Sequence, residues 1–136
     1  MSISPYLFFP GACREALTAY AEILGGEIEA MMTYGDAPPD EEMPQVDPAW
    51  IMHGAIRVGT DLIMATDDAP GRNVTPASTY IMVTLPSRDA AAAAFDRLAK
   101  GGEVQMGFEK TFWSEGFGSL RDRWGQLWMI SAESTS

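Results

Sequence analysis

Positive charge, cysteine, histidine and long apolar runs are all scarce in this chain, and each shortage excludes a class of protein. The 136 residues include 9 Lys and Arg against 19 Asp and Glu, which gives a formal net charge of −10. Phosphate backbones and anionic lipids are bound by clustered cations, whereas here only Arg121 and Arg123 lie close in sequence. We therefore expect no nucleic-acid partner and no membrane partner.

Three absences predict the cellular compartment. The lone Cys13 cannot form a disulfide within the chain, and no apolar run approaches the roughly 20 residues that span a bilayer. The N-terminal sequence MSISPYLFFP lacks the basic start and the cleavage site of a signal peptide. These features predict a soluble protein of a reducing compartment, which makes the cytoplasm the expected location.

The residues that are present suit a folded domain. Apolar residues make up 46% of the chain, aromatic residues 10% and charged residues 21%, which is enough to fill a core without a metal or a disulfide. The length is close to the commonest size of one domain. We therefore expect a single domain over residues 1–136.

Glycine and proline divide the first half into short segments whose hydrophobic periodicity predicts their structure. Apolar residues at helical spacing predict a helix over residues 13–24, stopped by Gly25 and Gly26. Gly59 and Thr60 indicate a hairpin turn. The predicted strands are residues 3–9, 27–34, 50–58 and 61–65, and residues 35–48 form an acidic loop.

The second half repeats this order after a loop over residues 66–77. An alanine-rich helix is predicted over residues 88–100, and Gly101 and Gly102 end it. The predicted strands are residues 78–85, 103–108, 116–123 and 126–131.

Two local echoes support an internal repeat. ILGGEIEAMM at 23–32 resembles LAKGGEVQM at 98–106, and RVGTDLIM at 57–64 resembles RWGQLWMI at 123–130. Both occur in the same order within matching frames of strand, helix and three strands. The sequence therefore predicts an α+β fold of paired βαβββ modules, one over about residues 3–67 and one over about residues 77–133.

Three segments carry a resemblance to a known family. They are YLFFPGACREALTAYAEILGGEIEAMMTYGDAP at 6–38, IMHGAIRVGTDLIMATDD at 51–68 and TFWSEGFGSLRDRWGQLWMIS at 111–131. With them the chain resembles the vicinal oxygen chelate superfamily, which contains glyoxalase I, extradiol dioxygenases and bleomycin-resistance proteins. Within it, the chain looks most like the PhnB-like branch, also named after 3-demethylubiquinone 3-methyltransferase. The resemblance implies cupped mixed sheets that hold a small-molecule ligand.

Metal-dependent relatives hold a divalent ion through His and Glu, and the resemblance implies which positions correspond. These are approximately Pro5, His53, Tyr80 and Met129. Only His53 is a competent ligand, because Pro and Met do not bind such an ion in that role and neutral Tyr is a poor substitute. We therefore expect no cofactor, disfavour a divalent metal, and assign His53 as a metal ligand only if a metal is present.

His53 is the only histidine, and three roles remain open for it. It is a hydrogen-bonded strand residue, a general base or ligand contact inside the cavity, or a metal ligand. Strand parity groups it with Ile51 and Ala55, opposite Met52, Gly54 and Ile56. Catalysis through Cys13 is disfavoured, because no histidine is near it in sequence to act as its base.

Several residues of the second module are either core or pocket lining. We assign Tyr80, Trp113, Arg121 and Met129 to a substrate pocket, with Trp113 favoured because it lies in a stretch that connects two strands. Simple burial in the core is the alternative for the aromatic and methionine side chains. Arg121 and Glu109 lie on neighbouring predicted strands, where they form an ion pair or orient a polar substrate.

Two functions of different classes remain. The first is a glyoxalase-like protein with a small-molecule cavity and an unassigned lyase, isomerase or oxygenase reaction. The second is a metal-free binding or drug-sequestering protein of the bleomycin-resistance type. Methyl transfer is less well supported, since no glycine-rich loop follows a strand and opens a helix. We also expect a homodimer, because cups of this superfamily are commonly completed between subunits.

Overall fold

The computed structural model describes residues 1–38, 45–68 and 76–133. The chain divides into two compact units, unit 1 over Met1–Val74 and unit 2 over Thr75–Ser136. The described residues contain eight strands, two α-helices and one short 3-10 helix. Neither α-helix of this part of the chain has the length and apolarity that crossing a membrane requires.

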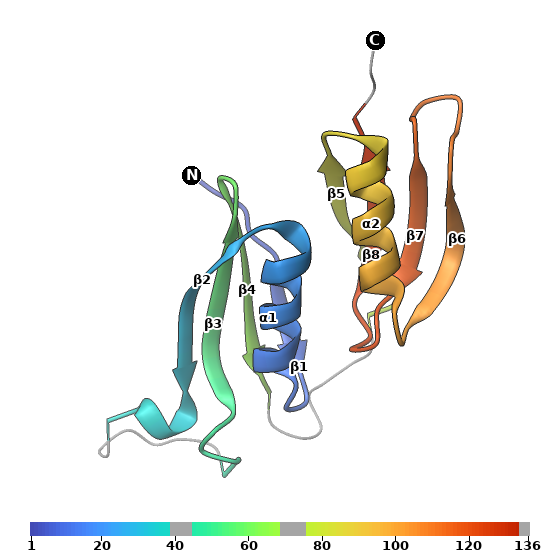
Figure 1. Ribbon diagram of the computed structural model, residues 1–136. Coiled ribbons are helices and arrows are strands. Elements are labelled where there is room, and N and C mark those ends of the chain that lie inside the picture. Colours follow the sequence, from blue (N-terminus) through green and yellow to red (C-terminus); the bar gives the residue numbers. More distant parts are fainter. Residues whose placement is uncertain (39–44, 69–75, 134–136) are drawn as a thin grey trace. The chain divides into compact units, whose positions relative to one another are not determined.

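Unit 1 is a four-stranded sheet with one helix on one of its faces (Figure 1). Its strands have the order β1-β4-β3-β2; β1 runs parallel to β4 and the other pairs are antiparallel. The elements are β1 (Tyr6–Phe9), α1 (Cys13–Leu24), β2 (Glu27–Thr33), the 3-10 helix η1 (Tyr34–Asp36), β3 (Ile51–Val58) and β4 (Asp61–Asp67).

Unit 2 has the same topology, again with one helix on one face of a four-stranded sheet (Figure 1). Its order is β5-β8-β7-β6, with β5 parallel to β8. The elements are β5 (Ile81–Leu85), α2 (Arg88–Ala99), β6 (Glu103–Glu109), β7 (Phe117–Arg121) and β8 (Leu127–Ala132). The α+β fold of paired βαβββ modules is therefore confirmed.

The first sequence echo is a true structural repeat. Glu27 pairs with Arg57 in unit 1, and Glu103 pairs with Arg121 in unit 2. The register then shifts between Ile28 and Ala30, and again between Val104 and Met106, so both units carry an irregularity at the same place.

After the turn, where it compares β4 with β8, the second echo is out of register by one residue. It aligns Ile63 with Met129, but Ile63 pairs with Ile56 on the face toward α1, whereas Met129 pairs with Ser119 on the face away from α2. The cause is the turn: only Gly59 and Thr60 join β3 to β4, whereas residues 122–126 join β7 to β8. A shift of one residue exchanges the two faces of a strand.

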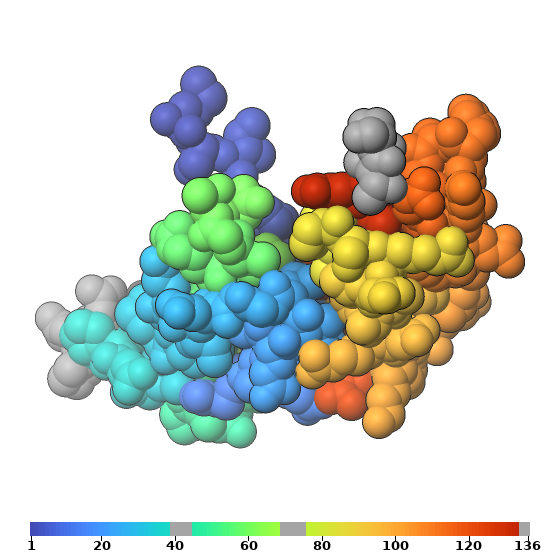
Figure 2. All heavy atoms as spheres, turned by 45° about the horizontal axis from the view of Figure 1, so that its top comes forward, coloured from blue at the N-terminus to red at the C-terminus, as the bar shows by residue number. Residues whose placement is uncertain are grey.

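Strand boundaries differ from the prediction at two informative places. β1 begins at Tyr6 rather than at residue 3, and the residues before it project from unit 1, with Met1 and Ile3 exposed (Figure 2). Pro5 has no N–H with which to continue a ladder. β4 runs on to Asp67, because the last two residues of the strand pair with Phe8 and Phe9.

Candidate functional site

Each sheet has one face that its own helix covers and one that the helix leaves uncovered, which we call the open face. A Cβ on Gly54 would lie 2.7 Å from Leu17 of α1, and a Cβ on Gly118 would lie 2.7 Å from Phe95 of α2. These glycines therefore mark the covered faces. Residues of opposite parity form the open faces, and in β2 and β6, whose register is irregular, the face follows from the residue paired on β3 or β7.

The open face of unit 1 carries His53 in an aromatic and apolar setting. The hydroxyl of Tyr6 lies 3.0 Å from Nδ1 of His53, and the two rings are 5.8 Å apart. Phe8 lies 5.7 Å from the Tyr6 ring and is 52% exposed. Met32 pairs with His53 across β2 and β3, and Met64 pairs with Tyr6 across β1 and β4.

The Tyr6 hydrogen bond defines what His53 offers to a ligand. Burial raises the pKa of the Tyr6 phenol, with Cys13 and Tyr34 adding to the effect, so the phenol keeps its proton at neutral pH. The phenol donates to Nδ1, or accepts from Nδ1–H in the other tautomer. In both cases Nε2 is the ring nitrogen left for a ligand.

Tyr6, Met32 and Met64 were not identified from the sequence as site residues. Tyr6 was assigned only to an apolar strand, because nothing in a single sequence shows that β1 pairs with β4, next to β3. The sequence of β1 is apolar or aromatic throughout, so it does not show that Tyr6 and Phe8 are exposed while Leu7 and Phe9 are buried.

The open face of unit 2 contains the predicted pocket residue Met129. Met82, Met129, Ser119 and Met106 form a row across the four strands. Met82 is 51% exposed and Met106 is 50% exposed. The row gives this face a thioether-rich, apolar surface.

Tyr80 and Arg121 lie at one end of this open face. Tyr80 comes just before β5 and its hydroxyl donates to Oε1 of Gln105 at 2.7 Å. Nη1 of Arg121 donates to the carbonyl oxygens of Pro76 and Gly125, at 2.7 and 2.8 Å. Arg121 therefore ties the segment before β5 to the β7–β8 turn.

The prediction that Arg121 forms an ion pair with Glu109 is wrong. The sheet register places Arg121 opposite Glu103, whereas Glu109 lies opposite Phe117 at the other end of β7. The two residues are on neighbouring strands, as predicted, but β6 and β7 run antiparallel, which sends them to opposite ends.

Trp113 lies in the connection between β6 and β7, as predicted. Its ring is edge-on to Phe117 at 5.6 Å and to Phe112 at 4.7 Å, and it is 55% exposed. Thr111 holds the connection in place, because its hydroxyl oxygen accepts from the backbone N–H groups of Trp113 and Ser114. Trp113 and Met129 thus belong to unit 2, whereas His53 belongs to unit 1.

The donor set does not fit the four-ligand divalent site of metal-dependent relatives. His53 lies in β3, whereas Met129 lies in β8, which corresponds to β4 and not to β3. The residue equivalent to Met129 is Met64, another thioether. Among the described residues, no three His, Cys, Asp or Glu side chains are grouped as metal ligands. The described residues therefore do not form a divalent-metal site of that kind.

Cys13 is buried and its thiol is unreactive. It is fully buried, and burial together with the nearby Asp67 raises the pKa of its thiol to about 12. The thiol is therefore protonated at neutral pH and does not act as a nucleophile.

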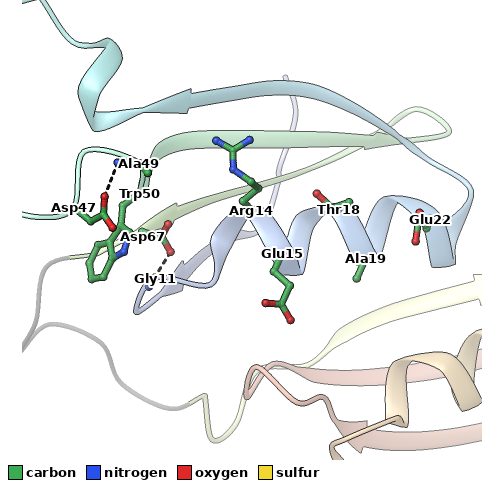
Figure 3. A pocket seen from close by; sticks show the side chains of 10 residues that line it. All are labelled: Gly11, Arg14, Glu15, Thr18, Ala19, Glu22, Asp47, Ala49, Trp50 and Asp67. Carbon is green, nitrogen blue, oxygen red and sulfur yellow. Dashed lines mark hydrogen bonds between the residues drawn. The ribbon is translucent and has the colours of Figure 1, made fainter.

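A separate hollow of about 560 Å³ lies beside α1 in unit 1 (Figure 3). Its wall combines charged residues of α1 with Trp50, whose ring packs against Gly11. It contains none of the predicted site residues and lies on the helix side of the sheet. The lining residues are Gly11, Arg14, Glu15, Thr18, Ala19, Glu22, Asp47, Ala49, Trp50 and Asp67.

Comparison with known proteins identifies the family. Residues 2–130 match the Glyoxalase/Bleomycin resistance protein/Dioxygenase superfamily. The chain belongs to this superfamily. Protein YjdN of Escherichia coli strain K12 is 30% identical, over 96% of this chain and 95% of that protein.

Solved structures agree with this membership in their fold. Protein PA1353 from Pseudomonas aeruginosa is 39% identical with a TM-score of 0.89, covering 98% of each chain. The PhnB protein from Bacillus cereus is 22% identical with a TM-score of 0.83, covering 98% of this chain and all (100%) of that chain. At that lower identity the likeness shows the fold alone, and fold does not by itself assign a reaction.

Proposed function

We propose that this member of the superfamily binds a small, largely apolar molecule on the open face of unit 1, without a divalent metal. The observation that carries the proposal is the Tyr6–His53 hydrogen bond of 3.0 Å, set on a sheet face with exposed aromatic and thioether side chains. Pockets for small molecules typically combine an apolar lining with a few placed polar groups. The bonded pair supplies such polar groups.

The chemistry of the face selects the ligand class. Phe8, Met32 and Met64 offer apolar contact to a flat ring, and sulfur–aromatic contacts are favourable. His53 Nε2 and the Tyr6 hydroxyl offer hydrogen bonds to a carbonyl or hydroxyl oxygen on that ring. An aromatic or conjugated molecule bearing one or two oxygen atoms fits this combination.

A thermal-shift screen on chelator-treated protein tests the proposal. Neutral aromatic compounds with carbonyl or hydroxyl groups are expected to raise the melting temperature. Tyr6→Phe removes one hydroxyl and is expected to weaken such a ligand by about 1 kcal/mol, or about fivefold in Kd. Tyr80→Phe is the matched control, because it removes a hydrogen-bonded hydroxyl from the open face of unit 2. Weakening by Tyr80→Phe but not by Tyr6→Phe would overturn the assignment to unit 1.

A cationic ligand is the second candidate, and a specific observation favours it. Phe112 and Trp113 form an exposed edge-to-face pair in a chain of net charge −10. Aromatic faces attract cations, and net charge steers them. Stabilisation by cationic aromatic dyes that Trp113→Ala abolishes and Tyr6→Phe leaves intact supports this drug-sequestering role instead.

His53 is also the candidate catalytic residue for a ligand bound on the open face of unit 1. His53 presents Nε2 for proton transfer, with Tyr6 orienting the ring through Nδ1. If a ligand found in the screen is also converted, His53→Ala is expected to remove turnover while apolar binding persists. Conversion that survives His53→Ala excludes His53 as the catalytic residue.

We also propose that the chain acts as a homodimer in the cytoplasm. The exposed apolar residues on the open face of unit 2, Met82 and Met106, support association because such area is costly to leave in water. Light scattering at micromolar concentration is expected to give the mass of two chains. The mass of one chain contradicts the dimer.

A further inference from the structure

We propose that the open face of unit 1 also holds a site for a soft monovalent metal ion, Cu(I) or its analogue Ag(I). The ligands are Nε2 of His53 and the thioether sulfurs of Met32 and Met64. This metal site is separate from the proposed binding of an organic molecule, and it rests on the placement and chemistry of these three side chains.

The sheet register brings the three ligands together. Met32 is directly opposite His53 in the antiparallel pair of β2 and β3, where Cα atoms are about 4.5–5.5 Å apart. Met64 lies opposite Ala55 on β4, so it is the diagonal neighbour of His53 on the same face, at about 7–8 Å. Rotation about χ1 and χ2 of each unbranched methionine side chain lets its sulfur close the remaining gap.

The donor types select the ion. Two neutral thioethers and one imidazole are soft to intermediate ligands, which suit Cu(I). Hard divalent ions prefer carboxylate and carbonyl oxygens, and none of the three proposed ligands supplies one. Met32 is 44% exposed and Met64 is half-buried, so an ion can reach the sulfurs from solvent.

Tyr6 completes the arrangement from the second coordination sphere. Its hydroxyl is 3.0 Å from Nδ1 of His53. A histidine that binds a metal through one nitrogen usually donates its other N–H to an oxygen, which fixes the ring. Tyr6 is therefore a positioning residue for this site.

The repeat supplies a control within the same chain. Ser119 pairs with Met129 as Ala55 pairs with Met64, which places Phe117 of unit 2 at the position of His53. Unit 2 keeps thioethers on its open face, Met82, Met106 and Met129, but has no imidazole there. The proposal therefore predicts tight binding in unit 1 only.

The experiment uses the full chain, stripped of metal, under anaerobic reducing conditions. Cu(I) is titrated against a chromophoric Cu(I) chelator, and we expect one tightly bound ion per chain. Met32→Leu with Met64→Leu is expected to weaken binding strongly, since Leu conserves the apolar volume but removes the sulfur. Met82→Leu with Met129→Leu, the matched control in unit 2, is expected to change nothing. Tyr6→Phe is expected to weaken binding roughly tenfold.

A second readout identifies the ligand directly. His53 is the only histidine of the chain, so every imidazole signal in an NMR spectrum belongs to it. Ag(I) is expected to shift these signals and the methyl signals of Met32 and Met64 in a folded protein. Unchanged imidazole signals at saturating Ag(I) overturn the site. The site is also overturned if the Met32/Met64 and Met82/Met129 double variants lose the same affinity for Cu(I), because the ion would then bind to exposed methionines without a defined site.

The two proposals fail independently. The metal titration contains no organic ligand, and the screen for organic ligands contains a chelator. Absence of tight Cu(I) binding overturns the metal site but not the proposed binding of an organic molecule. A thermal-shift screen without hits overturns the binding of an organic molecule but not the metal site.

Discussion

Replacing Asp67 with alanine is expected to lower the free energy of unfolding by about 3–5 kcal/mol. Asp67 is only 1% exposed, and its carboxylate holds three separate pieces of unit 1 together. Oδ1 accepts from the backbone N–H groups of Gly11 and Cys13 at 3.0 and 2.9 Å, and Oδ2 accepts from that of Ile51 at 2.9 Å. Alanine leaves these three donors without their acceptor.

Urea unfolding of the variant measures this effect. Asp67→Asn is expected to lose less, because its amide oxygen keeps two of the bonds while its NH₂ group faces the Ile51 donor. Asp61→Asn is the matched control, since Asp61 begins the same strand and is exposed. Equal stability of the Asp67→Ala and Asp61→Asn proteins contradicts this role of Asp67.

Gly102→Ala is expected to destabilise the protein by about 3 kcal/mol or more, the upper end of overpacking effects. A Cβ at this position would lie 2.2 Å from the carbonyl oxygen of Arg121 and 2.8 Å from the carbonyl carbon of Asp122. Both atoms belong to the backbone, so no side-chain rotation relieves the clash. Gly26 repeats the situation in unit 1, with 2.5 Å to the carbonyl oxygen of Arg57.

The control for Gly102→Ala is Gly107→Ala. Gly107 lies within β6, and a Cβ there would meet nothing within 4 Å. We expect Gly107→Ala to change stability by less than about 0.5 kcal/mol, measured by the same urea titration. A loss of the same size for both variants means that glycine is needed for β6 in general and not for the approach of residues 121 and 122.

Local pattern was sufficient to predict the elements and the repeat. The helix over residues 13–24 was predicted with its observed bounds, because its apolar spacing and the following Gly-Gly pair are signals within a few residues. The Gly-Gly pair was interpreted only as a helix stop. In the structure the two glycines of each pair have different roles. The first, Gly25 or Gly101, adopts a positive φ of 70° or 78°. The second, Gly26 or Gly102, leaves room for a backbone carbonyl where a Cβ would clash.

Contacts between strands far apart in sequence could not be predicted in this way. The role of Asp67 was missed because its partners Gly11 and Ile51 are 56 and 16 residues away, and the residue itself was assigned to a loop. The Glu109–Arg121 pairing was wrong for the same reason, because strand register depends on turn geometry and on the residues of both strands.

The candidate site was also predicted in part from residue types, while its long-range contacts were not. His53 was selected because it is the only histidine of the chain, and the missing ligands followed from residue types alone. Which face His53 occupies was left open, and the structure places it with Ala55 on the open face beside Tyr6. Tyr6 is 47 residues away from His53, so only the order β1-β4-β3 brings the two side chains together.

The sequence by itself determined the acidic character of the protein, the two βαβββ modules and the family resemblance. It also determined that three of the four positions corresponding to the metal ligands of relatives carry neither His nor Glu. These depend on residue type and on periodicity over short distances. Only the tertiary structure decided which side chains share an open face and which buried carboxylate joins the strands. These features depend on the tertiary structure because strand pairing joins residues from distant parts of the chain. In addition, a shift of one residue exchanges the two faces of a strand.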